Sequence, residues 1–268
     1  MDLDIICGII LVVVLLLILW IFYQPTNNMT QIPVVDENTF PFRTFIINLE
    51  RNPDRYEYVT NQLDNLSMNN YERWPGVDGS QISTIDLIKE GVNSHIAKNS
   101  KGMAGCAVSH IRLWKHILSE KLGWTLILED DAHFHPQFME IFSHYWNVVP
   151  TDAKVVYLGY GGDEIKSQNK DIAVYSANVI CMHAYMISWE GAQYLLRNLV
   201  PMVGTVDDTL SRYFRNNPGS YIFNGNVSVR GIRPHDYRDE QKSNHGGIVY
   251  QNQNEFKSMI VDINNEKN

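Results

Sequence analysis

From residue 43 onward, short apolar runs alternate with amphipathic stretches, and this alternation limits the fold more than any other feature. The apolar runs are rich in branched and aromatic residues, which predicts buried strands at 43–49, 71–79, 124–130, 154–159, 179–187 and 221–223. Between them, apolar residues recur at spacings of three and four, which predicts helices at 53–68, 104–122, 137–146, 190–199 and 206–216. Such alternation predicts an α/β sheet with helices on both faces.

An uninterrupted apolar run from Ile5 to Tyr23 precedes this pattern. As a helix, about 19 residues span roughly the 30 Å of a bilayer core. A cleaved signal peptide is the alternative, but it needs a basic start, whereas this chain begins with Asp2 and Asp4. We therefore predict a retained membrane anchor, and the expected organisation is an anchor at 1–24, a stem at 25–42, one domain at 43–250 and a polar tail at 251–268.

Composition and charge exclude some classes of protein. The chain has 268 residues, of which 44% are hydrophobic, so it can bury a large core and is not a disordered protein. Its 22 Lys and Arg against 30 Asp and Glu give a net charge of -8, so it lacks the basic field of a nucleic-acid binder. Cys106 and Cys181 either pair in an oxidising compartment or stay as reduced core thiols, and the second is the default.

Three consecutive carboxylates, Glu129, Asp130 and Asp131, end the apolar run at 124–130. Burying unpaired charge is costly, so such a cluster either faces water or receives a cation. Ligands of α/β sheets bind outside the carboxyl ends of the strands, so we expect these side chains to face a crevice. The cluster either binds a hard cation such as Mg²⁺ or Mn²⁺, or partly caps the next helix. The metal interpretation requires that arginines and lysines of the chain do not already neutralise it.

Two histidines, His133 and His135, follow the acidic cluster. Zinc sites are built from Cys and His at recognisable spacings, and no such grouping appears in the sequence. We therefore expect a hard cation instead of zinc, and we place both histidines at the surface or behind the metal ligands.

The stretch "KGMAGCAVSHIRLWKHILSEKLGWTLILEDD" (101–131) resembles the signature of glycosyltransferase family 25, which contains lipooligosaccharide and collagen galactosyltransferases. Further blocks resemble this family in the same order: "INLERNPDR" (47–55), "GVDG" (76–79), "VVYLG" (155–159), "HAYMISWEGAQYLL" (183–196), "TVDDTL" (205–210) and "RPHDYRDEQKS" (233–243). Collinear blocks are far more specific than any single motif.

The resemblance implies a GT-A fold, a single Rossmann-like domain in which the acidic triplet takes the part of the Asp-x-Asp of related enzymes. It implies a UDP-hexose donor, with galactose or glucose, and Mn²⁺ or Mg²⁺ that bridges the diphosphate to Asp131 and its neighbours. The acceptor would be a glycan, a lipid-linked saccharide or a protein hydroxyl. The alternative is a catalytically inactive binding or adhesion module, although degenerate copies tend to lose the acidic triplet that this chain keeps.

Several residues of the matching blocks are predicted to bind the donor. Arg51 and Arg55 contact the nucleotide or diphosphate, unless they are solvated helix charges. Gly102 and Gly105 mark either a close approach of the backbone to a ligand or a helix-entry loop. The predicted donor-binding residues are Asn48, Arg51, Arg55, Asp78, Gly105, Ser109, His110, Glu129 and Asp130.

An inverting transfer needs one general base to take the proton of the acceptor hydroxyl. We predict Asp207 as this base, with Asp208 as the alternative, although both residues could instead cap a helix. By analogy with other GT-A enzymes, His235 is predicted as a further metal ligand beside Glu129, Asp130 and Asp131.

The chain departs from the family in two ways. Collagen-modifying members carry two transferase domains, whereas residues 43–250 hold one, which puts hydroxylysine in doubt as the acceptor. Bacterial members mostly lack a span like Ile5 to Tyr23. We therefore predict a type II membrane protein of the Golgi or endoplasmic reticulum, in a eukaryotic or large-DNA-virus setting.

Overall fold

The computed structural model describes residues 13–14, 32–162, 172–174, 179–215, 217–225, 228–240 and 246–252. Within these ranges, no helix is both long enough and apolar enough to cross a membrane. The span predicted from Ile5 to Tyr23 lies outside the described residues, apart from Val13 and Val14. The membrane anchor therefore stays a prediction, as does the tail beyond residue 252.

A seven-stranded mixed sheet forms the centre of the fold, in the order β2-β1-β3-β8-β5-β9-β7. β1 pairs in parallel with both β2 and β3, and β5 pairs in parallel with β9, whereas β8 runs antiparallel between β3 and β5. The strands are β1 (Arg43–Asn48), β2 (Tyr71–Pro75), β3 (Thr125–Glu129), β5 (Val155–Tyr157), β7 (Ile172–Val174), β8 (Ala184–Ile187) and β9 (Ser220–Phe223). The parallel pairing of β1, β2 and β3 brings their carboxyl ends to one edge of the sheet.

Short antiparallel pairs lie beside this sheet. They join β4 (Ala132–Phe134) to β11 (Val249–Gln251) and β6 (Gly159–Tyr160) to β10 (Gly246–Gly247). The pairing of β4 with β11 brings the end of the described chain next to the residues that follow β3.

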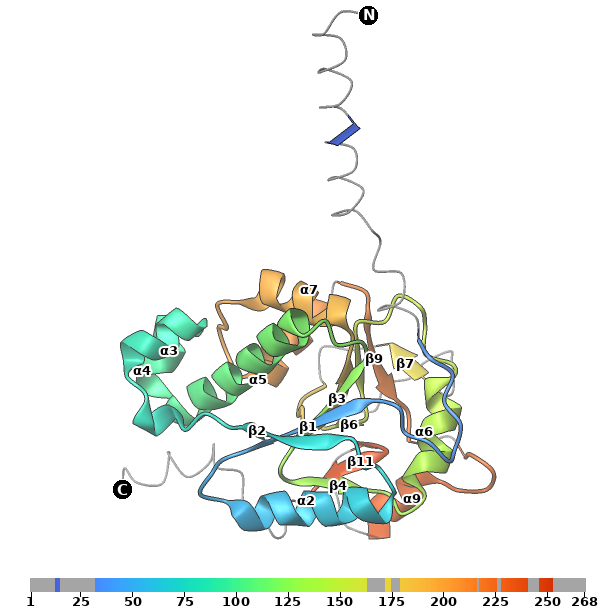
Figure 1. Cartoon of the computed structure of the whole chain (residues 1–268). Coiled ribbons are helices and arrows are strands. Elements are labelled where there is room, and N and C mark those ends of the chain that lie inside the picture. Colours follow the sequence, from blue (N-terminus) through green and yellow to red (C-terminus); the bar gives the residue numbers. More distant parts are fainter. Residues whose placement is uncertain are drawn as a thin grey trace, which may run out of the picture.

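Helices cover both faces of the sheet (Figure 1). One face carries α3 (Thr84–Glu90), α4 (Ser94–Asn99), α5 (Lys101–Ser119), α7 (Trp189–Leu199) and α8 (Val206–Phe214), and the other carries α2 (Pro53–Asn65) and α6 (Phe138–Trp146). Successive strand residues alternate between two cores, since Phe45 belongs to the first and Ile46 to the second. Burial on both faces explains why the strands read as continuous apolar runs.

The predicted α/β architecture is confirmed, with different element bounds. The helix predicted at 104–122 is α5, which begins at Lys101, and the strand predicted at 179–187 is reduced to β8. The sequence reasoning missed α3, α4 and α9 (Pro234–Glu240). The side chains of Ser83 and Asn93 cap α3 and α4 by accepting backbone N–H groups, which is a signal that the sequence carries.

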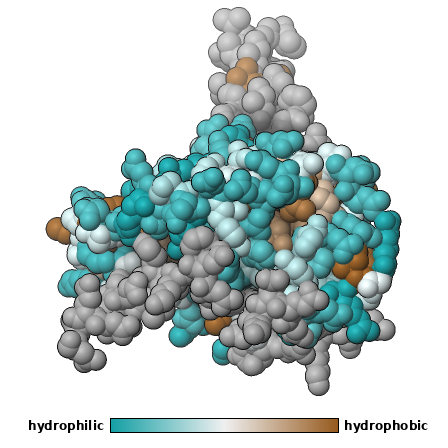
Figure 2. Space-filling model, turned by 90° about the horizontal axis from the view of Figure 1, so that it is seen from below, coloured by the Kyte–Doolittle hydropathy of each residue, from teal (hydrophilic) through white to brown (hydrophobic). Residues whose placement is uncertain are grey.

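The surface seen in Figure 2 is mostly hydrophilic, and its hydrophobic side chains form small separate patches. Large apolar side chains that are exposed among the described residues include Val34, Ile85 and Val203. Single exposed apolar residues of this kind are normal on folded domains. The helices therefore cover the apolar cores on both sides of the sheet.

The first turn of α5 packs against the turn that follows β2, backbone to backbone. A Cβ atom added to Gly105 would lie 2.4 Å from the carbonyl oxygen of Val77 and 2.6 Å from the backbone nitrogen of Gly79. Ser109 stabilises the same contact through two hydrogen bonds, because its Oγ accepts the Val77 N–H at 2.8 Å and donates to the Gly105 carbonyl at 2.8 Å. Gly105 is thus required for contact between two protein segments.

We expect Gly105→Ala to lower the free energy of unfolding by about 1–3 kcal/mol, because neither backbone segment can yield to the added methyl group. Gly123→Ala is the matched control, since a Cβ atom at Gly123 meets nothing within 4 Å. Urea denaturation of both variants measures the difference. Equal stability of the two variants would contradict this account of the contact.

Candidate functional site

A cavity of about 520 Å³ opens at the carboxyl ends of β1, β2 and β3. Its volume lies within the usual range of small-molecule sites. Of the residues predicted to form the site, it is lined by Arg51, Arg55, Asp78, Ser109, His110, Glu129, Asp130, Asp131 and Asp207, together with Gly102. The expected crevice beside the acidic cluster is therefore present.

Asp130 contacts two side chains that stabilise its charge. It forms an ion pair with Arg55 of α2, and its Oδ2 accepts a hydrogen bond from Asn48 Nδ2 at 2.7 Å. Burial nevertheless raises the pKa of Asp130 to about 6, against the opposing effects of Arg55 and Asn48. Asn48 does not line the cavity, so its contact with Asp130 gives it a supporting place behind the wall instead of the predicted place beside the donor.

Asp131 is buried and only partly compensated. Its Oδ2 accepts a hydrogen bond from Gln251 Nε2 at 2.9 Å and lies 3.4 Å from Arg55. Its Oδ1 is buried and has no hydrogen-bond partner within the described part of the chain. Burial and the charge of Glu129 raise the pKa of Asp131 to about 7. The nearby charge of Arg55 therefore does not fully stabilise an ionised Asp131.

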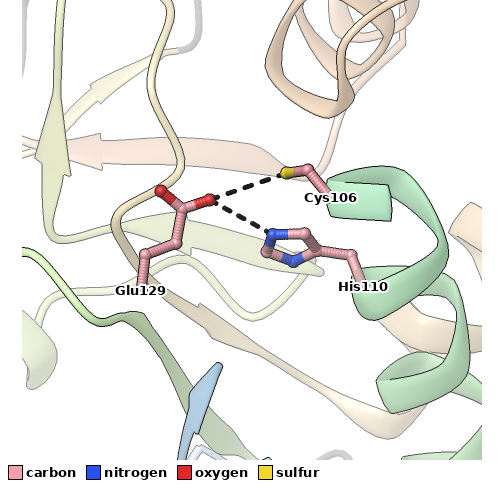
Figure 3. A group of neighbouring side chains, drawn as sticks. All are labelled: Cys106, His110 and Glu129. Carbon is pink, nitrogen blue, oxygen red and sulfur yellow. Dashed lines mark hydrogen bonds and ion pairs between the residues drawn. The ribbon is translucent and has the colours of Figure 1, made fainter. Parts of the chain in front are cut away.

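Glu129 ends β3 and meets two side chains of α5 (Figure 3). Its Oε1 lies 3.4 Å from His110 Nε2 and 3.9 Å from Cys106 Sγ. Burial alone would raise the pKa of Glu129, but the contact with His110 and the nearby positive charges outweigh burial and lower it. Glu129 therefore carries its negative charge more readily than its neighbours do.

The cavity wall keeps an excess of negative charge despite these contacts. It holds five carboxylates, Asp78, Glu129, Asp130, Asp131 and Asp207, against three permanent cations, Arg51, Arg55 and Lys101. Arg51 pairs with Asp78, and Arg55 is shared between Asp130 and Asp131. The chain thus neutralises the acidic cluster only in part.

His110 is held by a chain of buried hydrogen bonds. Its Nδ1 lies 2.8 Å from the hydroxyl of Tyr185, which also accepts the indole N–H of Trp114 at 3.0 Å. Burial keeps the pKa of the Tyr185 phenol well above its usual range, so the hydroxyl stays neutral. Its contacts fix the imidazole ring with Nε2 directed at Glu129.

The start of α5 brings a part of the cavity wall that favours anions. The first turn of α5 supplies Lys101, Gly102 and Met103 to the cavity, and no side chain caps this end of the helix among the described residues. The N-terminus of a long helix carries partial positive charge and free N–H groups, which bind phosphate groups well. Arg51 adds a further positive charge to this side.

The remaining predicted residues are split between the cavity and other parts of the fold. Asp207 lines the cavity, where its Oδ2 accepts the Cys181 N–H at 2.9 Å and its Oδ1 accepts the Asp208 N–H at 2.9 Å. Asp208 does not line it and instead accepts a hydrogen bond from Arg212 at 2.9 Å. Gly105 and His235 also lie outside the lining, and His235 of α9 contacts Arg238.

Several lining residues were missed as site residues. Cys106, Cys181 and Lys101 lie in the wall, and both cysteines are free, as expected for reduced thiols. Cys106 precedes His110 by four residues, so a search for ligands on one helix face would have found it. Gln251 was assigned to the tail, and nothing in the sequence relates β11 to the acidic cluster.

A family model described as glycosyltransferase family 25 (LPS biosynthesis protein) matches residues 42–210. The chain belongs to glycosyltransferase family 25. This confirms the family predicted from the sequence motifs, and the mixed α/β sheet fits the Rossmann-like fold of a glycosyltransferase.

Proteins similar to this family 25 chain occur in insects and vertebrates. A glycosyltransferase 25 family member of Drosophila melanogaster is 30% identical over 66% of the chain and 31% of its own length. One of Aedes aegypti is 30% identical over 65% of the chain and 31% of its own length. Human procollagen galactosyltransferase 2 is 24% identical over 73% of the chain and 34% of its own length. The chain thus spans about a third of each of these relatives.

We expect Asp131→Asn to raise the melting temperature in EDTA at pH 8. The pKa of Asp131 is about 7 in the folded chain, above the ordinary value of 3.8. Between these two values the folded state holds a proton that the unfolded state releases, so wild-type stability falls as pH rises towards 7. The variant has no carboxylate to ionise at this position, so its melting temperature should exceed that of the wild type by an amount that grows from pH 5 to pH 8. Each kcal/mol of difference in the free energy of unfolding corresponds to roughly 2–4 °C.

Asp78→Asn is the control with the opposite sign. Hydrogen bonds from Ser80, with the charge of Arg51, lower the pKa of Asp78, so its ionised form stabilises the fold and its loss should lower the melting temperature at pH 8. Thermal melts of all three proteins test the pair of predictions. A wild-type melting temperature at pH 8 equal to that of Asp131→Asn would show that Asp131 carries no such cost.

Proposed function

We propose that this chain is a metal-dependent, inverting glycosyltransferase that moves a hexose from a UDP-sugar to a glycan or protein hydroxyl. The observation that carries the proposal is the cavity at the ends of the parallel strands, whose wall contains both the acidic cluster and the N-terminus of α5. The name of the human relative, a procollagen galactosyltransferase, supports galactose as the transferred sugar.

The acidic wall fits a hard divalent cation. Asp131 presents a buried oxygen without a partner in the described part of the chain, and Glu129 is ionised beside it. Carboxylate oxygens are the ligands that Mn²⁺ and Mg²⁺ prefer. Asp131 and Glu129 would hold the ion, while Asp130 is largely occupied by Arg55. When bound, the ion supplies positive charge for the diphosphate of the departing UDP.

The start of α5 and Arg51 would bind and orient the donor. The backbone N–H groups at Gly102 and Met103 and the guanidinium of Arg51 favour the negatively charged diphosphate. Gly105 and Ser109 fix this wall by holding α5 against the turn after β2. A rigid wall keeps these groups in place, so little reorganisation is needed during the reaction.

Asp207 is proposed as the general base. Its carboxylate lies in the cavity wall and is held by two backbone N–H groups, which fixes its position. An acceptor hydroxyl bound against it would give its proton to Asp207 while its oxygen attacks the sugar from the face opposite to UDP. The contact of Asp208 with Arg212, outside the cavity lining, supports the choice of Asp207 over Asp208.

We expect Asp131→Asn to lower metal-dependent release of UDP from a UDP-hexose on the order of 100-fold, because the ion that stabilises the leaving group loses a main ligand. Assays of the purified full chain, with UDP-galactose and UDP-glucose and with Mn²⁺ or EDTA, measure this loss. The control is Asp86→Asn, an exposed carboxylate of α3 that pairs with Lys89. Unchanged release in Asp131→Asn would remove the proposed metal site.

We expect Asp207→Asn to lower kcat for transfer by roughly 10²–10⁴-fold while the dissociation constant for UDP changes little, because the base acts on the acceptor and not on the nucleotide. Asp208→Asn is the matched control and should retain transfer. Calorimetric titration with UDP and Mn²⁺ separates binding from catalysis. Failure of the wild-type chain to bind UDP at all would favour the catalytically inactive binding module.

A further inference from the structure

Three side chains of different chemistry converge in the cavity wall. Cys106 and His110 lie one turn apart on α5, and both point at the carboxylate of Glu129 at the end of β3 (Figure 3). One sulfur, one imidazole nitrogen and one carboxylate oxygen all lie within 4.8 Å of one another. This donor set differs from the all-carboxylate group of Glu129, Asp130 and Asp131, because sulfur and nitrogen suit softer metals.

The spacing of these atoms is close to that of a tetrahedral metal site. Zinc binds nitrogen and oxygen at about 2.0–2.1 Å and sulfur at about 2.3 Å, so tetrahedral angles place nitrogen about 3.3 Å and sulfur about 3.6 Å from the oxygen. The observed separations are 3.4 Å for His110 Nε2 to Glu129 Oε1 and 3.9 Å for Cys106 Sγ to the same oxygen. An N–H···O hydrogen bond is usually 2.7–3.2 Å long, so the imidazole and the carboxylate stand further apart than a good hydrogen bond requires.

The surroundings of His110 are those of a metal-binding imidazole. Metal-bound histidines almost always use their second ring nitrogen in a hydrogen bond that fixes the ring. Here Nδ1 lies 2.8 Å from the Tyr185 hydroxyl, which Trp114 holds in turn through an indole N–H at 3.0 Å. This arrangement leaves Nε2 as the ligand atom on the cavity side.

We propose that Cys106, His110 and Glu129 form a binding site for a borderline-soft divalent cation such as Zn²⁺ or Co²⁺, which shares only Glu129 with the proposed hard-cation site. All three residues line the cavity, so an ion reaches them from solvent. Three protein ligands leave a fourth position open to the cavity, as in zinc sites that bind a small ligand.

Binding exchanges the thiol proton of Cys106 for the metal, and the proton passes to solvent. Burial raises the pKa of the Cys106 thiol well above its usual range, so the metal-free site holds a neutral thiol. A divalent cation in direct contact with sulfur reverses this preference, because its charge is the largest in the site.

The two metal sites share Glu129, so they exclude one another. This consequence rests on the proposed function, since it assumes that Glu129 helps to hold the hard cation of the transferase. A soft ion at Cys106 and His110 withdraws that carboxylate and occupies part of the cavity. Zn²⁺ therefore inhibits transfer in the presence of Mn²⁺.

The test is a titration of the full chain with Co²⁺, followed by absorption spectroscopy without any sugar nucleotide. We expect one equivalent of Co²⁺ to give thiolate-to-cobalt charge-transfer absorption, which Cys106→Ser abolishes. Cys181→Ser is the matched control, because Cys181 lines the same cavity but is not one of the three converging residues, and it should keep the absorption. The absorption does not depend on transferase activity. A chain without transferase activity can therefore still confirm the Cys106–His110–Glu129 site, and an active transferase can still lack it.

A second variant tests whether the Tyr185 hydroxyl orients the His110 imidazole for metal binding. Tyr185→Phe removes the hydroxyl beside His110 Nδ1, and we expect Co²⁺ to bind roughly 10–100-fold more weakly with its charge-transfer absorption restored at saturation. Circular dichroism shows whether each variant is folded. Absence of the absorption in the folded wild-type chain, its persistence in Cys106→Ser, or its loss in Cys181→Ser would each overturn the proposal.

Discussion

Crowding Glu129, Asp130 and Asp131 at the buried end of β3 is the constraint around which this site is built. Like charges in a poorly solvated place repel one another and lose hydration, so each needs a compensating contact. The fold provides these contacts from distant elements: Arg55 comes from α2, His110 from α5 and Gln251 from β11. Three segments far apart in the sequence are thus drawn to one strand end.

The contacts do not fully compensate the negative charge of the acidic cluster, and Asp131 shows this most clearly. Asp131 keeps a buried oxygen without a partner among the described residues, and its pKa is raised to about 7. A protein selected only for stability would replace or pair such a group. The proposed cation of the transferase would supply the missing positive charge, and Glu129 is shared between that proposed site and the softer donor set of Cys106 and His110.

Backbone contact fixes another part of the cavity wall. Gly105 and Gly79 bring the start of α5 against the turn after β2, closer than any side chain allows. This contact places the N-terminus of α5 in the wall of the same cavity as the carboxylates. A wall that contains both a carboxylate cluster and a helix N-terminus would suit the metal-bound diphosphate of the proposed donor.

The sequence by itself determined the architecture, the family and the acidic strand end, because hydrophobic period and collinear motifs are local properties of a chain. The sequence also proposed Asp207 as the general base, with Asp208 as the alternative. Only the tertiary structure places Asp207 in the cavity wall and pairs Asp208 with Arg212, gives Asn48 and Gly105 contacts with other parts of the protein, and brings Cys106 and Gln251 to the site. The physical reason is that these roles depend on which side chains meet across the sheet edge, and such long-range contacts follow from packing that local periodicity does not encode.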